Sequence, residues 1–168
     1  YKGHGYLIEA ERELDAVVWL VGTGPLENEL RRLVDKLGLS DRVRFWGAVA
    51  DENLPALVQA CDVFVLPSIS PNEAFGLVQI EAMACAKPVV SCALRSGVPY
   101  VNQDGVTGLI VPPADAAALR AALKPLLADE AWRTRLGEAG RVRAEKEFEE
   151  SVMLHRYWDC FQRALARA

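Results

Sequence analysis

Residues 63–90 read VFVLPSISPNEAFGLVQIEAMACAKPVV, and this stretch decides the fold. The apolar run Val63–Leu66 predicts a buried strand, and a polar loop with two prolines follows it. A helical segment then begins near Phe75 or Gly76, and Pro88 precedes a second β-branched run. Strand, loop, helix and strand in this order predict a parallel α/β sheet, in which ligands collect beyond the carboxyl ends of the strands.

Two carboxylates mark this stretch, Glu73 in the loop and Glu81 in the helix. Between them, the first-turn amides of Gly76, Leu77 and Val78 should lack helical acceptors, and such amides suit a phosphate group. Eight helical residues from Glu73 to Glu81 would rise roughly 12 Å, about the length of a diphosphate with a sugar at either end. Sugar hydroxyls could then donate to both carboxylates. Alternatively, Glu73 only complements the helix dipole and Glu81 is a solvated residue.

The stretch resembles the EX7E signature of retaining, nucleotide-sugar-dependent glycosyltransferases of family four, which have the two-domain GT-B fold. Glu73 and Glu81 carry the resemblance, within PSISPNEAFGLVQIEAMACAKPVV, and it extends over nearly the whole chain. One departure is Ala86, where the family usually has glycine. The resemblance implies that the chain is the carboxyl-terminal, donor-binding half of an enzyme, with Glu73 at the donor sugar and Glu81 at the ribose hydroxyls.

The resemblance also assigns a role to the first residues of the chain. The family has a lysine in a Lys-Gly loop that neutralises the donor diphosphate, and this would be Lys2; a flexible terminal lysine is the alternative. A strand ending in Gly-Arg precedes this loop in the family but is not in this sequence, so we expect a fragment. The implied catalytic residues are Glu73 and Lys2. The implied nucleotide-sugar-binding residues are Lys2, Gly24, Val49, Glu73, Phe75, Gly76, Leu77, Val78 and Glu81.

Gly24 and Val49 come from two further loops. Gly24 lies in a Gly-x-Gly turn between a predicted strand and helix, which is a weak dinucleotide signal because the third glycine is absent. The turn needs no ligand, although the family has a similar loop lining its donor cleft. Val49 follows the next strand, where backbone atoms of the family contact the nucleotide base. In a third loop, Tyr100 stands where many relatives have an acid near the donor sugar, which leaves the sugar open.

The remaining pattern predicts a Rossmann-like, doubly wound parallel sheet, the carboxyl-terminal half of a GT-B fold without its first strand. Asp51 and Asp115 should cap helices, and Ser151 should cap a terminal helix to about Ala166. The expected strands are 16–21, 43–47, 63–66, 89–91 and 109–111.

We expect residues 1–150 to form the nucleotide-sugar-binding domain and residues 151–168 a terminal helix. This helix carries an aromatic stripe, which would pack in the core or, as in the family, against the amino-terminal domain absent from this sequence. Its arginines would suit an anionic membrane surface or simply form a solvated face. They are Arg156, Arg163 and Arg167.

Composition excludes several classes of protein. A net charge of −4 gives no basic field for nucleic acid, and no apolar run approaches the roughly 20 residues of a membrane span. No signal peptide is visible, and no carboxylate cluster has metal-ligand spacing. The four cysteines form no C-x-x-C pair, which favours buried, reduced thiols in a cytoplasmic protein. They are Cys61, Cys85, Cys92 and Cys160.

The resemblance therefore implies a retaining hexosyltransferase that takes a UDP-, GDP- or ADP-sugar without a metal or other cofactor. Its acceptor would be a glycan or lipid-linked molecule, such as lipopolysaccharide or another surface polysaccharide. The chain alone should bind donor but transfer nothing, because in the family the acceptor-binding side of the cleft belongs to the amino-terminal domain. A nucleotide-sugar epimerase and a non-catalytic nucleotide- or sugar-binding module are the alternatives.

Overall fold

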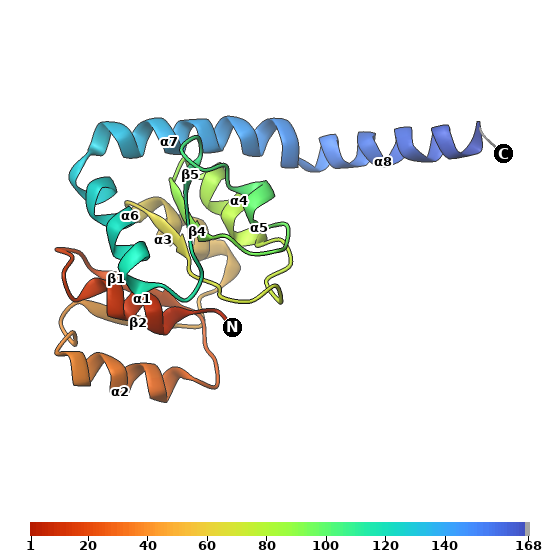
Figure 1. The fold of residues 1–168 in the computed structure, drawn as a ribbon. Coiled ribbons are helices and arrows are strands. Elements are labelled where there is room, and N and C mark those ends of the chain that lie inside the picture. Colours follow the sequence, from red (N-terminus) through yellow and green to blue (C-terminus); the bar gives the residue numbers. More distant parts are fainter. Residues whose placement is uncertain (167–168) are drawn as a thin grey trace.

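The computed structural model describes residues 1–166, in which five strands alternate with helices (Figure 1). Short 3₁₀ and π-helical turns at Asp51–Asn53 and Ala144–Phe148 precede α3 and α8. In chain order the elements are α1 (His4–Glu11), β1 (Val18–Val21), α2 (Glu27–Leu37), β2 (Val43–Gly47), α3 (Leu54–Ala60), β3 (Phe64–Leu66), α4 (Leu77–Ala84), β4 (Val89–Cys92), α5 (Val98–Val101), β5 (Gly108–Val111), α6 (Ala116–Ala128), α7 (Glu130–Arg143) and α8 (Glu150–Leu165).

All strand pairs are parallel, as the sequence predicts, but the strands form two groups. β1 pairs with β2, and β3, β4 and β5 form a second sheet in that order. Val18 lies opposite Val43 in the first group, and Val89 lies between Phe64 and Gly108 in the second. The expected alternation is confirmed, and the loops that follow parallel strands gather at one edge.

Helices cover both faces of the strands, which confirms the doubly wound, Rossmann-like arrangement. The larger core cluster joins the sheet to α1, α2 and α6, and the smaller one joins it to α3, α4 and the turn at 144–148. Buried side chains hold each layer in place; they include Ile8, Val34 and Leu119 in the larger cluster and Val58, Met83 and Ala144 in the smaller.

One of the three predicted helix caps is confirmed. Asp115 precedes α6 and its Oδ1 accepts a hydrogen bond of 2.8 Å from the Ala118 amide. Asp51 is not a cap, because it already lies inside the 3₁₀ turn, and Ser151 lies inside α8. Both helical segments begin earlier than expected, so these side chains do not stand before the first free amides.

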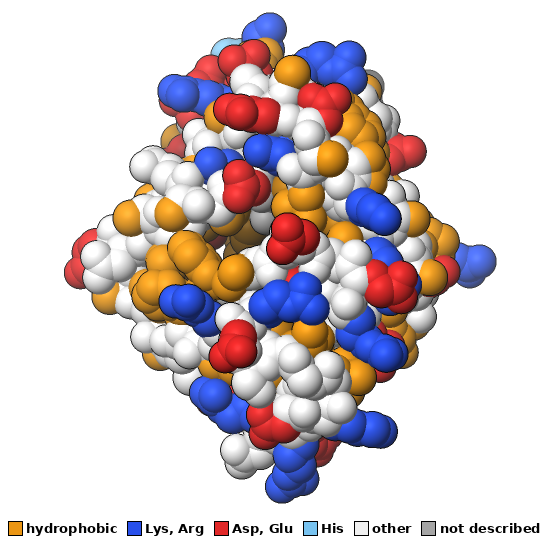
Figure 2. Space-filling model, turned by 90° about the vertical axis from the view of Figure 1, so that its left-hand side faces the viewer, with side chains coloured by type: hydrophobic (Ala, Val, Ile, Leu, Met, Phe, Trp, Pro, Cys, Tyr) orange, Lys and Arg blue, Asp and Glu red, His pale blue; other side chains and the backbone are white. Residues whose placement is uncertain are grey.

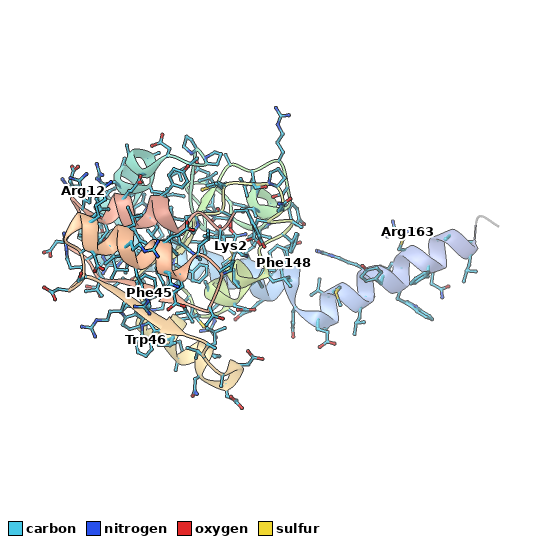
Figure 3. All side chains as sticks on the ribbon, turned by 90° about the horizontal axis from the view of Figure 1, so that it is seen from below. Lys2, Arg12, Phe45, Trp46, Phe148 and Arg163 are labelled. Atoms are coloured by element: carbon cyan, nitrogen blue, oxygen red, sulfur yellow. The ribbon has the colours of Figure 1, made fainter. Side chains whose placement is uncertain are left out.

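The terminal helix α8 extends away from the body as an arm (Figure 1). Arg156 pairs with Glu147 at 2.7 Å near its start, Arg163 lies far along the arm (Figure 3), and Arg167 is outside the described residues. The aromatic stripe of α8 is exposed, so the prediction that it packs in the core is wrong. Its packing against another domain stays a prediction. The stripe residues are 47–71% exposed: Met153, Leu154, Tyr157, Trp158, Phe161 and Leu165.

The cysteines are free thiols, and only one is fully buried. Cys92 lies in β4, where burial raises the pKa of its thiol to about 11. Cys61 and Cys85 are half-buried and Cys160 is exposed on α8, so the prediction of buried thiols is right for Cys92 alone. No helix within residues 1–166 has the length and apolar character needed to cross a bilayer.

Candidate donor-binding site

The centre of the candidate site is an ion pair between two residues that the sequence separates widely. Lys2 Nζ lies 2.6 Å from Glu73 Oε2, and the same oxygen accepts a hydrogen bond of 2.9 Å from Ser68 Oγ. Glu73 is 8% exposed, whereas the Lys2 side chain is about half exposed. Glu73 Oε1 has no partner among residues 1–166. The structure thus unites Lys2 and Glu73 and leaves one carboxylate oxygen available.

The first residues of the chain are docked against the loop after β3. The Ile69 amide donates to the Tyr1 carbonyl at 2.9 Å. Gly3 has φ of 70°, and a Cβ there would collide with the carbonyl of Pro67. Only glycine fits at position 3, because the backbone there is left-handed and the Pro67 carbonyl leaves no room for a Cβ. This contact fixes the backbone position of Lys2, which lies on the same side of the body as Phe148 (Figure 3).

The helix of the motif begins later than the sequence suggested. α4 starts at Leu77, so only half of the stretch from Glu73 to Glu81 is helical, and the predicted rise of eight helical residues is wrong. Glu73 is a loop residue rather than a first-turn carboxylate. Glu81 is an exposed residue of α4 with no ion pair in the described part of the chain.

The amino end of α4 keeps the features expected of an anion site. No side chain caps it, and within residues 1–166 the amides of Gly76, Leu77 and Val78 have no acceptor. Gly76 has φ of 71°, and a Cβ there would lie 2.8 Å from both Leu66 Cδ2 and Gln79 Nε2. The glycine therefore serves close internal packing against Leu66 and Gln79.

Two residues of this region escaped the sequence analysis. Ser68 is fully buried and holds Glu73, and its position directly after β3 was the available signal. Gln79 is also fully buried; its Nε2 donates to the Phe75 carbonyl at 3.2 Å, and its Oε1 has no partner in the described structure. A glutamine among apolar residues of the first turn was the signal for that position.

Phe75 contributes to the loop through aromatic packing rather than through a polar contact. Its ring lies 6.4 Å from the Tyr100 ring and 6.0 Å from the Phe148 ring. The Gly97 amide donates to the Ala74 carbonyl at 2.7 Å, which ties the loop after β4 to the loop after β3. Tyr100 thus belongs to a cluster of three aromatic rings with Phe75 and Phe148.

The remaining two predicted site residues lie at the same edge of the sheet. The Gly22 amide donates to the Gly47 carbonyl at 2.7 Å, which joins the ends of β1 and β2. Gly24 follows directly and is exposed, and Val49 is half-buried. The structure gives no contact between these two and Lys2 or Glu73, so their role stays a prediction.

Electrostatics at this edge favour an anion. Burial, and to a smaller degree the charges of Lys2 and the amino terminus, lower the pKa of His4, so its imidazole is neutral at neutral pH. Lys2 is the cation that contacts Glu73, which lies four positions before the first residue of α4. Among the described side chains no three His, Cys, Asp or Glu residues gather in a metal-binding group. The expected independence from metal stays a prediction.

Comparison with known proteins gives a consistent picture. The profile of a family described as "Glycosyl transferases group 1" matches residues 1–143. The "O-antigen chain mannosyltransferase C" of Escherichia coli is 39% identical over 157 residues, which are 94% of this chain and 42% of that protein.

Two solved structures resemble the chain over nearly its whole length. Sucrose-phosphate synthase from Thermosynechococcus elongatus superposes with a TM-score of 0.87 and 36% identity, covering 99% of this chain and 43% of that one. Anabaena HepE in complex with UDP-glucose gives a TM-score of 0.87 and 28% identity, covering 96% and 45%. The chain thus spans less than half the length of these proteins.

Proposed function

The chain belongs to the family of group 1 glycosyl transferases, and from this premise we propose that it binds a nucleotide-diphospho-sugar as the donor half of a retaining transferase. The enzyme would transfer a hexose to a glycan or lipid-linked acceptor of a surface polysaccharide. The E. coli relative is named for O-antigen mannosyl transfer, and HepE was solved with UDP-glucose, which supports this class of donor and product.

The observation that carries the proposal is the cluster of Lys2, Glu73 and the free first turn of α4. A diphosphate at the amino end of α4 would meet the amides of Gly76, Leu77 and Val78 and the positive end of the helix dipole. Lys2 would turn from Glu73 to the phosphate oxygens, since its side chain is half exposed and its partner is retained by Ser68. Glu73 would then accept hydrogen bonds from the donor sugar.

The nucleoside half of the donor would lie along the edge toward β1 and β2. We assign the ribose hydroxyls to Glu81, an exposed carboxylate without an internal partner in the described structure. The base would rest on the backbone near Val49, and Gly24 would line the same cleft. Phe75 supports the sugar side through its packing on Tyr100.

Chemically, this arrangement suits departure of the nucleoside diphosphate. Negative charge grows on the diphosphate as the glycosidic bond of the donor breaks, and positioned donors such as Lys2 and the α4 amides stabilise that charge. None of these groups binds an acceptor, and holding two substrates in line contributes many kcal/mol to a transfer reaction. We therefore infer that the acceptor site lies in another domain, against which the exposed stripe of α8 packs.

Calorimetric titration of the 168-residue chain with UDP, GDP and ADP, each with and without EDTA, tests donor binding. We expect saturable binding of one of the three, unchanged by the chelator. No binding of any nucleotide, or loss of binding with EDTA, would overturn the proposal.

Turnover of the sugar donor by the same chain tests whether this chain alone can transfer or epimerise the sugar. After a nucleotide-sugar is incubated with the chain and candidate acceptors, mass spectrometry should show no transfer, and proton NMR of the sugar donor should show no epimer. Transfer would place the acceptor site within this chain, and epimerisation would favour an isomerase instead.

A further inference from the structure

Arg143, the last residue of α7, binds the end of another helix. Its Nε donates to the Val101 carbonyl at 3.0 Å, and its Nη2 donates to the Tyr100 carbonyl at 2.6 Å. Both carbonyls belong to the last turn of α5, where no following helical turn supplies donors for them. Arg143 therefore fixes α5 to the end of α7.

The same guanidinium packs against two aromatic rings. Its Cζ lies 5.3 Å from the centre of the Tyr100 ring and 5.2 Å from the centre of the Phe148 ring, within the range of cation–π attraction. The two rings meet edge to face with their centres 6.0 Å apart. Phe148 belongs to the π-helical turn that follows α7. Arg143 thus holds one ring from α5 and one ring from the turn before α8.

Both rings pack on Phe75, which stands directly before Gly76 in the loop that leads into α4. The centre of the Phe75 ring lies 6.4 Å from that of Tyr100, and it meets the Phe148 ring edge to face at 6.0 Å. A Cβ at Gly97 would collide with the Phe75 ring, so this residue approaches it closely as well. Such close packing leaves the ring few alternative positions.

The backbone of this loop is held at the same place. The Ala74 carbonyl accepts from the Gly97 amide at 2.7 Å, and the Phe75 carbonyl accepts from Gln79 Nε2 at 3.2 Å. Neither contact uses the Glu73 carboxylate or the free first-turn amides of α4, which lie on either side of Ala74 and Phe75 in the chain. The spacing between carboxylate and amides therefore depends on how these two residues are fixed.

We propose that Arg143 is a positioning residue for the donor site. Through the rings of Tyr100 and Phe148 it fixes Phe75, and Phe75 fixes the loop that joins the Glu73 carboxylate to the free amides of α4. The role is indirect, because no hydrogen bond or ion pair joins Arg143 to Glu73 in the described structure. The effect on donor affinity rests on the proposed function, whereas the effect on the loop is measured without a ligand.

Arg133 offers a matched control on the same helix. Its Nη1 donates to the carbonyls of Leu126 and Leu127, both at 2.8 Å, so it also joins α7 to the last turn of another helix. Arg133 lines a groove of about 500 Å³ that contains none of the proposed donor-site residues. Figure 2 shows a hollow with hydrophobic side chains on the face turned away from α8, which agrees with the apolar lining of this groove.

The first measurement is hydrogen exchange by NMR, without ligand, in Arg143→Met, Arg133→Met and the unchanged chain. The Gly97 amide is the reporter because it donates into the loop, and the amides of β4 report global unfolding. Relative to β4, Arg143→Met should speed exchange of the Gly97 amide by about tenfold or more, and Arg133→Met should leave it unchanged. Equal exchange in the two variants would overturn the proposal.

Arg143→Lys provides a second variant in case Arg143→Met does not fold. Lysine keeps the charge but lacks the planar fork that binds both carbonyls. It should speed exchange of the Gly97 amide less than methionine does, and exchange as slow as in the unchanged chain would contradict the role of the fork.

The second measurement is calorimetry with whichever of UDP, GDP and ADP the unchanged chain binds. We expect about tenfold weaker binding in Arg143→Met and in Phe75→Leu, and unchanged affinity in Arg133→Met. Because Arg143 acts through Phe75, the double variant should bind as Phe75→Leu does, whereas independent effects would multiply to about a hundredfold.

Multiplied effects in the double variant, or unchanged affinity in Arg143→Met, would overturn the proposal. If the unchanged chain binds none of the three nucleotides, the proposed function fails instead, and exchange of the Gly97 amide alone decides whether Arg143 holds the loop.

Discussion

Replacing Gly76 by alanine tests whether the loop before α4 is built as tightly as described. Gly76 has φ of 71°, a conformation that costs a non-glycine residue about 1–2 kcal/mol. The new Cβ would lie 2.8 Å from Leu66 Cδ2 and from Gln79 Nε2, closer than packed atoms normally approach. Overpacking of this kind costs a further 1–3 kcal/mol or so. We expect Gly76→Ala to lower the free energy of unfolding by about 2–5 kcal/mol.

Gly105 offers a matched control within the same chain. Its φ is 70°, but a Cβ at that position would have nothing within 4 Å. Gly105→Ala should therefore show the conformational cost alone, about 1–2 kcal/mol. Urea denaturation of both variants isolates the packing cost as the difference between them, and thermal midpoints should differ by a few °C per kcal/mol.

The result that would refute this reasoning is equal destabilisation by the two substitutions. It would mean that Leu66 and Gln79 yield to a methyl group without cost, so that the loop is looser than its contacts imply. A nucleotide titration of Gly76→Ala adds a second readout, because a displaced first turn should also weaken diphosphate binding.

Three further predictions address the carboxylates and the terminal helix. Glu81→Ala should weaken nucleoside diphosphate binding by about 1.5–3 kcal/mol in calorimetry, whereas Glu73→Ala should not weaken it, because it releases Lys2 from its ion pair; equal losses would contradict the separate roles. Burial raises the pKa of Glu11 from 4.5 to about 7, so the folded chain holds an extra proton and its urea midpoint should fall as the pH rises from about 4.5 to about 7. Glu11→Gln should flatten that profile, and an unchanged profile would exclude Glu11 as its cause. Deleting residues 150–168 should move the thermal midpoint by no more than a few °C, since the stripe is exposed; unfolding of the truncated chain would show that α8 stabilises the body.

Local patterns in the sequence predicted most of the fold. Apolar runs located all five strands, and β2 at Val43–Gly47 agrees at both ends. Glycine also marks the end of α2 at Leu37, where Gly38 follows with φ of 68°. Ala86, the one departure noted from the resembled motif, has a positive φ of 55°, a conformation that favours glycine. The division of the strands into two groups was not predicted, because pairing depends on which strands are neighbours in space.

The candidate site is built on residues that the sequence singled out, and their roles stay predictions. The position of Glu73 in a loop was predicted, but its partner Ser68 was not, and the rise of eight helical residues to Glu81 was wrong because α4 begins only at Leu77. The partner Lys2 is 71 positions away in the sequence, so no local pattern could reveal the pair. The exposure of the α8 stripe likewise depends on the direction in which a helix leaves the body, which periodicity does not encode.

The central claim is that Lys2 and the free first turn of α4 bind a diphosphate. Calorimetry with the best-bound nucleoside diphosphate tests it in Lys2→Met, with Lys124→Met, an exposed lysine of α6, as the control. We predict a loss of about 1.5–3 kcal/mol for Lys2→Met, roughly 10- to 100-fold in Kd, and none for Lys124→Met. Unchanged affinity in Lys2→Met would contradict the claim.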